Sequence, residues 1–575
     1  MDKRGGTGLL TLLLTAALAL SGCGVPSDGP AEEIDVEQND GTGAGANSGE
    51  VLSPHTDAEL SLDNYLSVAA GNPSTRGERL NQFYENPPSE PLDPAQIVNV
   101  VDVHDMHPLR TSDQEEARFR VSGEIVGLYD QWGQLSPPEG KRDFSYDMKL
   151  ARSQPDGKWR LVDPPSKILL RAGTFNAEYQ VAPLYFQRRD STSLVPDVRY
   201  IYADATRDRK RVDLVTWLLD GPSEWLASAV TTAFPSATKL NQPPFLDKNN
   251  LIVDLGSDAV TGDENRMAAQ LAWTLWGVGN EYVLDLRLNG QPVLQNAFSA
   301  FRDLNPTAAY SSDSAPQVHY LTKGRVDDSA DALYSDVKNA KYVATSIQKD
   351  HVVSVGDDGK VTVHVKTMKK AEEVVTSSKV KGMPGGAVGR PTWIGEETLL
   401  VPVGGELLAV NVGEDGVWRV QEGSLASGVG RVSAALDGGR LAMTVGGRAY
   451  VVPVLPQGDG TVALGDRRVV DRGNDEVIDV GWSEEHRLVL LGAAPERFLV
   501  RATIDNVDIF KYEDEGPSFP PDSLAVSCDS PADIRAVSTE VVVTVGGMLY
   551  QTESQGLRPM DVDGAEVFGS APFYA

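Results

Sequence analysis

The feature that most constrains the fold is a hairpin phrase that returns along the C-terminal part of the chain. Its first clear copy spans residues 401–410, and shorter copies follow at residues 444–452 and 543–550. Each copy places Gly-Gly between two runs of alternating apolar residues. This pattern predicts a tight hairpin, because a type I′ turn needs positive φ at both central positions.

The copies recur at a regular interval. Weaker copies surround Gly356 and Gly492, so the expected turn glycines fall 42 to 54 residues apart, at positions 356, 404, 446, 492 and 546. A further strand precedes several copies, at residues 390–393, 431–434, 479–482 and 534–537. Three or four short strands per interval are typical of a β-propeller. We expect five or six blades over residues 310–575, with residues 317–321 supplying strands to a sixth.

The N-terminus predicts a bacterial lipoprotein signal. A short positive segment precedes an apolar run at residues 9–20, which is too short for a bilayer core that needs about 20 residues. The run ends in Leu-Ser-Gly-Cys, which resembles a lipobox whose small residues admit the peptidase. We expect residues 1–22 to be cleaved and Cys23 to become an N-palmitoyl, S-diacylglycerol cysteine. An ordinary signal peptide with a chance cysteine, or a buried apolar helix, is the alternative.

Composition restricts where the chain can work and with what. Residues 23–57 are rich in Gly, Ser and acidic residues without Lys or Arg, which predicts an extended, disordered tether. The whole sequence has 82 Asp and Glu against 52 Lys and Arg, a net charge of -30, which argues against nucleic acid as a partner. Two cysteines exclude a disulfide-framed scaffold and a Cys-ligated zinc site. We expect no cofactor and no metal.

Two mixed domains are expected between the tether and the propeller, so the chain combines α+β and all-β parts. Helical spacing from Glu59, followed by strand-like alternation, predicts an α+β domain over residues 58–168 that resembles NTF2-like or cystatin-like folds by element order. Residues 183–300 predict a second domain in which helices and strands alternate along the chain. The expected helices lie at 211–219 and 265–276, and the expected strands at 250–255 and 282–288. This segment resembles the GerMN, or Germane, domain, most specifically in Gly221-Pro222 after a helix.

Few residues are candidates for chemistry. His104 and His107 lie three apart on an extended segment and would point to opposite faces, so we expect an exposed turn rather than a metal site. Asp254 and Asp285 could serve as acid and base, although acids at strand ends are more often solvated or capping groups. Cys528 has no basic neighbour and is expected to be a packing residue. With no Gly-x-Ser-x-Gly, HExxH or P-loop motif, we expect that the chain is not an enzyme.

A lipobox, an acidic tether, an α+β domain, a GerMN-like domain and a C-terminal propeller occur in this order in the LpqB family of actinobacterial lipoproteins. The chain resembles that family over nearly its whole mature length. The resemblance implies a lipid-anchored protein on the extracytoplasmic face of the cell membrane. It also implies contact with the extracytoplasmic domain of a sensor histidine kinase, MtrB of the MtrA–MtrB two-component system. The chain would modulate that kinase in cell-envelope homeostasis and division.

A cell-wall or small-ligand binding lipoprotein without a signalling role is the alternative function. It would need exposed aromatic side chains for stacking on sugars, whereas Trp217, Trp225, Trp273 and Trp276 lie at a helical spacing typical of a core. Clustered aromatic residues at the mouth of the propeller would favour ligand binding. Convergent carboxylates with raised pKa values would instead favour an envelope hydrolase.

Overall fold

The computed structural model describes residues 52–575 apart from short gaps, and residues 43–575 form one compact unit. The gaps fall at residues 139–141, 191–192, 257–262, 280–281, 294–307, 312–317, 323–324, 328–336, 338–339, 347–349, 366–367, 376–385, 414–415, 472–475, 495–497, 512–522, 527–540, 546–547, 554–555, 563–564, 567–569 and 575. Cys23, the tether up to residue 51 and Cys528 lie outside the described residues. Within the described part, no helix is both long and apolar enough to cross a membrane.

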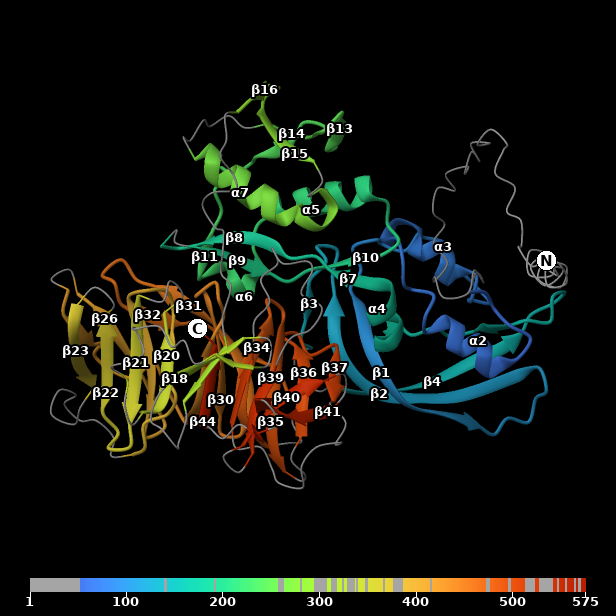
Figure 1. The fold of residues 1–575 in the computed structure, drawn as a ribbon. Helices are drawn as coiled ribbons and strands as arrows, with labels where there is room; N and C mark the ends of the chain where they lie inside the picture. Colours follow the sequence, from blue (N-terminus) through green and yellow to red (C-terminus); the bar gives the residue numbers. More distant parts are fainter. Residues whose placement is uncertain are drawn as a thin grey trace, which may run out of the picture. The chain divides into compact units, whose positions relative to one another are not determined.

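The N-terminal domain packs short helices against a mostly antiparallel sheet (Figure 1). Its helices are α2 (Ala58–Tyr65), the 3-10 turn η1 (Pro73–Thr75), α3 (Arg76–Asn81) and α4 (Ala172–Glu178). Its strands are β1 (Val98–Leu109), β2 (Glu116–Tyr129), β3 (Leu135–Ser136), β4 (Asp143–Arg152), β5 (Trp159–Leu161) and β6 (Ile168–Arg171). The sheet order is β5-β4-β2-β1-β6, and only the pair β1 and β6 is parallel. The expected α+β domain is confirmed, and its likeness to NTF2-like folds stays a prediction.

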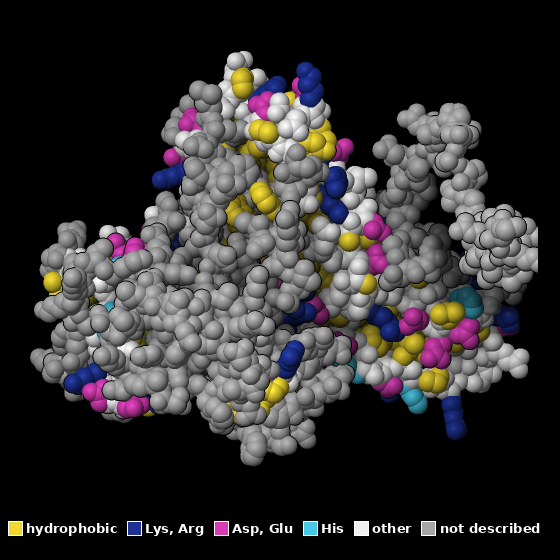
Figure 2. Space-filling view, viewed as in Figure 1, with side chains coloured by type: hydrophobic (Ala, Val, Ile, Leu, Met, Phe, Trp, Pro, Cys, Tyr) yellow, Lys and Arg dark blue, Asp and Glu magenta, His cyan; other side chains and the backbone are white. Residues whose placement is uncertain are grey.

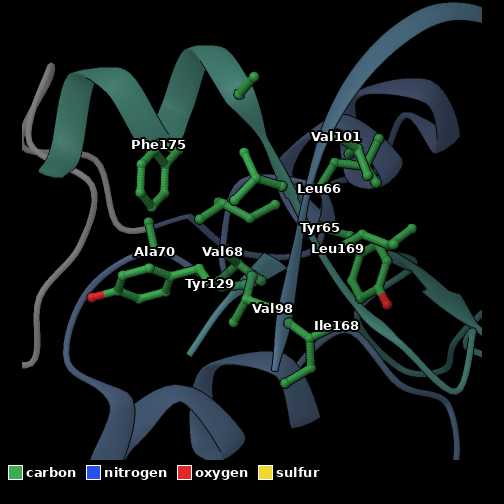
Figure 3. Close-up of a cluster of buried hydrophobic side chains, with 14 of the residues drawn as sticks. Tyr65, Leu66, Val68, Ala70, Val98, Val101, Tyr129, Ile168, Leu169 and Phe175 are labelled. Carbon is green, nitrogen blue, oxygen red and sulfur yellow. The ribbon is translucent and has the colours of Figure 1, made fainter. Parts of the chain in front are cut away.

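The core of this domain forms where α2, β1 and α4 meet. Figure 3 shows Tyr65 and Leu66 from the end of α2 with Val98 and Val101 of β1, all of them buried. Phe175 of α4 is fully buried and lies edge-on to Tyr129, with ring centroids 5.3 Å apart. Aromatic pairs of this geometry add about 0.5–1.5 kcal/mol to the burial of their area.

The second domain contains a parallel strand pair with its crossover helix. Its main sheet has the order β12-β14-β15-β16, with β13 also paired to β14, and β14 is parallel to β15. The strands are β12 (Lys239–Leu240), β13 (Phe245–Asp247), β14 (Asn250–Gly256), β15 (Val283–Leu288) and β16 (Gln291–Pro292). Its helices are α5 (Arg207–Asp220), α6 (Glu224–Ala227), α7 (Glu264–Thr274) and α8 (Trp276–Gly279). Gly221, with φ 106°, ends α5 where the Gly-Pro signal predicts a stop.

Smaller sheets connect this domain to its neighbours. One has the order β11-β8-β9, built from β8 (Leu184–Arg188), β9 (Leu194–Asp197) and β11 (Val230–Thr231). Another pairs β7 (Tyr179–Val181) with β10 (Tyr200–Tyr202). In the view of Figure 2, hydrophobic, acidic and basic side chains are interspersed over the described surface of the second domain.

Within the described part of the chain, the C-terminal region forms six sheets, four with four strands and two with a fifth short strand added. The first three are β17 (Ala308–Ser311), β18 (Val318–Thr322) and β19 (Arg325–Asp327) with β44 (Ser570–Tyr574); β20 (Ala340–Thr345), β21 (His351–Gly356), β22 (Val361–Val365) and β23 (Met368–Val375); and β24 (Thr392–Trp393), β25 (Thr398–Val403), β26 (Glu406–Val412) and β27 (Trp418–Val420), with β28 (Ala426–Ser427) added to β26.

The remaining three units complete the region. They are β29 (Val429–Ala434), β30 (Arg440–Val445), β31 (Arg448–Pro456) and β32 (Val462–Leu464), with β33 (Arg468–Val469) added to β31; β34 (Glu476–Glu484), β35 (Arg487–Ala494), β36 (Phe498–Thr503) and β37 (Ile509–Lys511); and β38 (Ser523–Val526), β39 (Val541–Val545), β40 (Met548–Glu553) and β41 (Gly556–Pro559). A small hairpin pairs β42 (Asp561–Val562) with β43 (Ala565–Glu566).

These sheets are the blades of a closed propeller. The strand at the end of each sheet touches the equivalent strand of the next, in the order β44, β20, β24, β29, β34, β38 and back to β44. The C-terminal β44 pairs with β17, so the last strand of the chain completes the first blade. This arrangement confirms the propeller and gives six blades in the described residues.

Local chemistry explains the hairpins of two blades. Gly404 and Gly405 have φ of 56° and 86°, and Gly446 and Gly447 have φ of 57° and 77°, as a type I′ turn requires. Gly492 was expected at a turn, but it lies in β35 and pairs with Phe498, so that expectation is wrong. Gly546 lies outside the described residues.

A tryptophan joins neighbouring blades at two equivalent places. Trp393 Nε1 donates to the carbonyl of Ala344 at 3.2 Å, and Trp482 Nε1 donates to the carbonyl of Ser433 at 3.0 Å. In each case a tryptophan near the end of an innermost strand bonds the innermost strand of the preceding blade. The same hydrogen bond between neighbouring blades therefore recurs where the strand phrase recurs in the sequence.

Candidate functional site

The candidate functional region is one end of the propeller, where the innermost strands finish and turn back. The turns there lie at residues 394–397, 435–439 and 485–486. Residues of the second domain contact these turns, and we therefore call this the covered end. Ser193 Oγ donates to the carbonyl of Asp437 at 2.6 Å.

Two tyrosines of the second domain bond carboxyl groups at the covered end. Tyr185 Oη in β8 donates to Glu485 Oε2 at 2.6 Å, and Tyr200 Oη in β10 donates to Asp505 Oδ2 at 2.6 Å. Both tyrosines are buried, at 4% exposure each. Burial raises the pKa of Glu485 to about 7 and raises the pKa of Asp505 as well, because a carboxylate loses its hydration in this setting. The two acids are used to join domains.

An arginine organises the turns beneath these bonds. Arg440 is fully buried, and its Nη2 donates to Asp437 Oδ2 at 2.7 Å while its Nη1 donates to the carbonyl of Glu485 at 2.6 Å. Its guanidinium also lies 4.7 Å from the ring centroid of Trp482. The neighbouring His486 has its pKa lowered to about 3 by burial and by nearby arginines, so it is neutral at pH 7. Arg440 is therefore a structural cation, because its Nε, Nη1 and Nη2 groups all donate hydrogen bonds.

The tryptophans singled out from the sequence are used in packing, and one of them lies at this junction. Trp225 Nε1 donates to the carbonyl of Asp466 at 2.9 Å, and the Arg468 guanidinium lies 4.4 Å from the Trp225 ring centroid. Trp273 packs against Tyr185 at 5.6 Å and against Trp276 at 6.1 Å between ring centroids. Trp217 packs against the core of the second domain. These side chains are used in packing, with Trp225 at the junction rather than within one domain.

The N-terminal domain meets the other two at β10. Tyr129 Oη donates to the carbonyl of Tyr200 at 3.0 Å, and Arg199 Nη1 donates to the carbonyl of Trp132 at 3.1 Å. Arg199 is 1% exposed and also pairs with Asp197 at 2.7 Å. A buried ion pair of this kind becomes costly when one partner is removed, because the other charge is left without compensation. The three domains are thus connected by buried polar bonds as well as by apolar packing.

The residues singled out from the sequence lie in ordinary structural positions. His104 and His107 are exposed on β1 rather than in a turn. Asp254 Oδ1 accepts from Gly290 N at 2.9 Å and Asn241 Nδ2 at 3.2 Å, and Asp285 pairs with Arg287 at 2.8 Å. Among the described residues, no group of three or more His, Cys, Asp and Glu is placed to hold a metal ion. Asp254 and Asp285 lie on the paired strands β14 and β15, and both act on Arg287, whose pKa is raised mainly by its hydrogen bond to Asp285 and further by the charge of Asp254.

Sequence reasoning missed the residues of the junction. Tyr185 and Tyr200 stand in apolar strands, and Glu485 and Asp505 stand in polar turns, so each looks ordinary in its own segment. The members of each bonded pair lie 300 and 305 residues apart. No local signal could have linked them.

The fold and the junction define a class: a six-bladed propeller joined through buried bonds to two smaller α+β domains. Three family models match the chain in this order. They are the lipoprotein LpqB N-terminal domain at residues 59–176, the Germane domain of sporulation and spore germination at 183–294, and the lipoprotein LpqB β-propeller domain at 317–575. The chain belongs to the LpqB family of lipoproteins.

Relatives named lipoprotein LpqB span most of the chain. The protein of Rhodococcus jostii is 24% identical over 533 residues, covering 86% of each sequence. That of Mycobacterium tuberculosis is 23% identical and covers 98% of each. Similar solved structures include virginiamycin B lyase from Staphylococcus aureus, with 12% identity and a TM-score of 0.28 over 47% of this chain and 92% of that chain. TolB from Acinetobacter baumannii has 13% identity and a TM-score of 0.28 over 47% and 66%.

Proposed function

We propose that this chain is an extracytoplasmic lipoprotein, anchored through Cys23, that binds the extracytoplasmic domain of a sensor histidine kinase and modulates its signalling. The lipobox and the membership in a lipoprotein family support the anchor. A diacylglycerol and an N-acyl chain together provide a stable anchor, because each buried methylene contributes about 0.8 kcal/mol. Confinement near the membrane then raises the effective concentration of the two partners, so that weak contacts suffice.

The observation that carries the proposal is the buried junction. The bonds Tyr185–Glu485 and Tyr200–Asp505 hold the second domain on the propeller at 2.6 Å each. A surface that spans both domains is therefore organised before a partner arrives. Such preorganisation reduces the entropy lost on binding. Contact that favours one conformation of the kinase would shift its population by the difference in affinity for its states.

We also propose that the chain acts by binding and not by catalysis. Burial raises the pKa of three described carboxyl groups, Asp130, Glu485 and Asp505. Glu485 and Asp505 each accept a hydrogen bond from a tyrosine of the neighbouring domain, and Asp130 Oδ1 accepts from the backbone N–H groups of Trp132 and Gln134. These structural roles explain the shifts without a reaction. This argument supports the binding role over the hydrolase alternative.

Crosslinking in intact cells, followed by mass spectrometry of the captured proteins, tests the proposal. We expect the wild-type chain to capture the extracytoplasmic domain of a sensor kinase, and the Cys23→Ala variant to lose it because it is no longer held at the membrane. A Ser21→Ala variant, which keeps a small residue before the cysteine, is the matched control and should behave as wild type. Capture of wall glycan or other envelope proteins alone would contradict the signalling role.

A further inference from the structure

A cluster of cations lies at the opposite end of the propeller. This far end is where the innermost strands begin and where the Gly404-Gly405 and Gly446-Gly447 turns lie. Tyr342, Gly389 and Arg431 lie there, on or just before the innermost strands of their blades. Tyr342 pairs with Val355, Gly389 N donates to the carbonyl of Pro402, and Arg431 N donates to Thr444 Oγ1. Val355, Pro402 and Thr444 each stand shortly before the hairpin turn that follows their own strand. The positions are equivalent in successive blades.

Cationic groups surround the ring of Tyr342. Lys341 Nζ lies 5.3 Å from the ring centroid, Arg390 Cζ lies 6.0 Å from it and Arg431 Cζ lies 5.9 Å from it. Arg390 Nη2 also lies 3.8 Å from Asp479 Oδ2. That distance is longer than the roughly 2.7–2.9 Å of a charge-assisted hydrogen bond. Three cations and one carboxylate thus share a small region.

Two contacts that skip a blade show that this cluster lies in the central channel of the propeller. Tyr342 belongs to β20 and Arg431 to β29, with the blade of β24 between them. Arg390 precedes β24 and Asp479 belongs to β34, with the blade of β29 between them. Each innermost strand contacts the next one around the ring, so a contact that skips a blade must cross the space the ring encloses. In propellers that space is the channel.

The cluster can be reached from solvent. Lys341 is exposed, whereas Tyr342 and Arg431 are half-buried and the Arg390 side chain is 12% exposed. Arg431 Nε is buried and makes no hydrogen bond to the described residues. Like charges brought together in a partly dry channel repel each other, in a chain whose net charge is -30. An anion would relieve that repulsion and offer an acceptor to the buried Nε of Arg431.

We propose that the far end of the propeller channel binds a phosphoryl group, held by the guanidinium forks of Arg390 and Arg431 and by the Lys341 ammonium. Arg forks match phosphate and carboxylate oxygens geometrically. The convergence of three cations on one ring favours phosphate, because a phosphate monoester carries about -1.5 to -2 at pH 7, whereas a carboxylate carries a single charge.

Direct binding of inorganic phosphate tests the site. The full-length chain, in a phosphorus-free detergent and buffer, is titrated with phosphate at constant ionic strength while the width of the phosphorus NMR line is followed. We expect saturable broadening with the wild type and at least a tenfold weaker dissociation constant for Arg431→Gln. Arg431→Lys keeps the positive charge but lacks the guanidinium group, so its dissociation constant should fall between those of the wild type and Arg431→Gln. Arg419→Gln, which removes an exposed arginine from the outer strand β27, should stay within twofold of wild type.

Other results would overturn the proposal. The site is refuted if the phosphorus NMR line of phosphate does not broaden on addition to the wild type. It is also refuted if Arg419→Gln weakens phosphate binding as much as Arg431→Gln does. Equal competition by acetate at the same ionic strength would contradict the phosphoryl assignment. Matching melting temperatures of Arg431→Gln and wild type exclude misfolding as the cause of a loss. Where Arg431→Gln melts lower, the single variant Tyr342→Phe, which changes the same region but keeps all the cations, should bind phosphate as wild type does.

A second arm distinguishes a soluble phosphorylated ligand from a lipid headgroup. The unanchored Cys23→Ala chain is floated with phosphatidylglycerol vesicles and with phosphatidylcholine vesicles. If the chain floats with phosphatidylglycerol vesicles and the Cys23→Ala/Arg431→Gln variant does not, the bound phosphoryl group is that of a lipid headgroup. Phosphate binding in the titration without such flotation supports a soluble phosphorylated ligand. Failure in both arms contradicts the site.

Discussion

Arg440 at the covered end and Arg431 at the far end are two arginines of one blade with opposite environments. Arg440 is fully buried, bonds Asp437 and the Glu485 carbonyl, and stacks on Trp482. Arg431 is half-buried, lies beside two other cations around Tyr342, and has a buried Nε without a hydrogen bond to the described residues. The comparison teaches that one repeat can stabilise the assembly at one end and leave charge available for a ligand at the other.

The largest expected effect is the loss of the structural arginine. Replacement of Arg440 by Met should lower the free energy of unfolding by about 3–5 kcal/mol, because Asp437 would be left buried without its partner. Urea unfolding followed by tryptophan fluorescence measures the change. Arg419→Met, which removes an exposed arginine, should stay within about 0.5 kcal/mol of wild type. A small effect of Arg440→Met would mean that the covered end does not depend on this cation.

The next effect concerns the pH at which the junction is strongest. The pKa of Glu485 in the folded chain is raised to about 7, above an ordinary value of about 4.3, so the stability it contributes is fully present below about pH 4 and is lost as the pH rises through about 7. Glu485→Gln, which mimics the neutral acid, should therefore be more stable than wild type at pH 8 by on the order of 1–3 kcal/mol. The two should converge toward pH 4.

Chemical unfolding of both proteins at several pH values measures this difference. The depressed pKa of His486 acts in the opposite direction, lowering stability as the pH falls from about 6.5 towards about 3, but it is present in both proteins and cancels. Glu476→Gln, at the exposed first position of β34, the strand that leads to the Glu485 turn, is the control and should show no such difference. A pH-independent difference for Glu485→Gln would contradict the raised pKa.

A smaller effect is expected for the second tyrosine–acid bond. Tyr200→Phe removes the hydroxyl that donates to Asp505, and should cost about 1–2 kcal/mol because a buried acceptor loses its partner. A double-mutant cycle with Asp505→Ala, which removes the acceptor, isolates the interaction of the two side chains. Additive losses in the cycle would show that the bond does not couple the two domains.

The smallest effect on stability is expected at the far end. Arg431→Gln should change the free energy of unfolding by no more than about 0.5 kcal/mol, since it removes one of three like charges and no hydrogen bond of its Nε. The same denaturation experiment provides this number beside that of Arg440→Met. A loss comparable to that of Arg440→Met would erase the distinction between the two ends of the propeller.

Much of the fold could be predicted because its signals are local. The Gly-Gly turns at 404–405 and 446–447 follow from the positive φ of two adjacent residues, and the end of α5 follows from Gly221. Gly492 is the exception, because an isolated glycine in an apolar run does not by itself specify a turn. It pairs with Phe498 inside a hairpin.

The candidate site could be predicted only in part. The phrases that begin with Arg390, Arg431 and Asp479 were recognisable as innermost strands, yet nothing in them indicates that their first residues meet. That meeting depends on closure of the ring, which brings alternate blades within reach across the channel. Cys23 remains the lipidation site that the sequence predicts, outside the described residues.

By itself, the sequence determined the order of the domains and the repeated hairpins, and it predicts the lipobox, because each rests on neighbouring residues and on backbone preferences. Only the tertiary structure decided that Tyr185 meets Glu485, that Tyr200 meets Asp505 and that cations converge on Tyr342. The physical reason is that ring closure and domain docking join residues far apart in the chain. Burial then changes what those side chains do: it raises the pKa of the acids at one end, while ring closure brings positive charges together at the other.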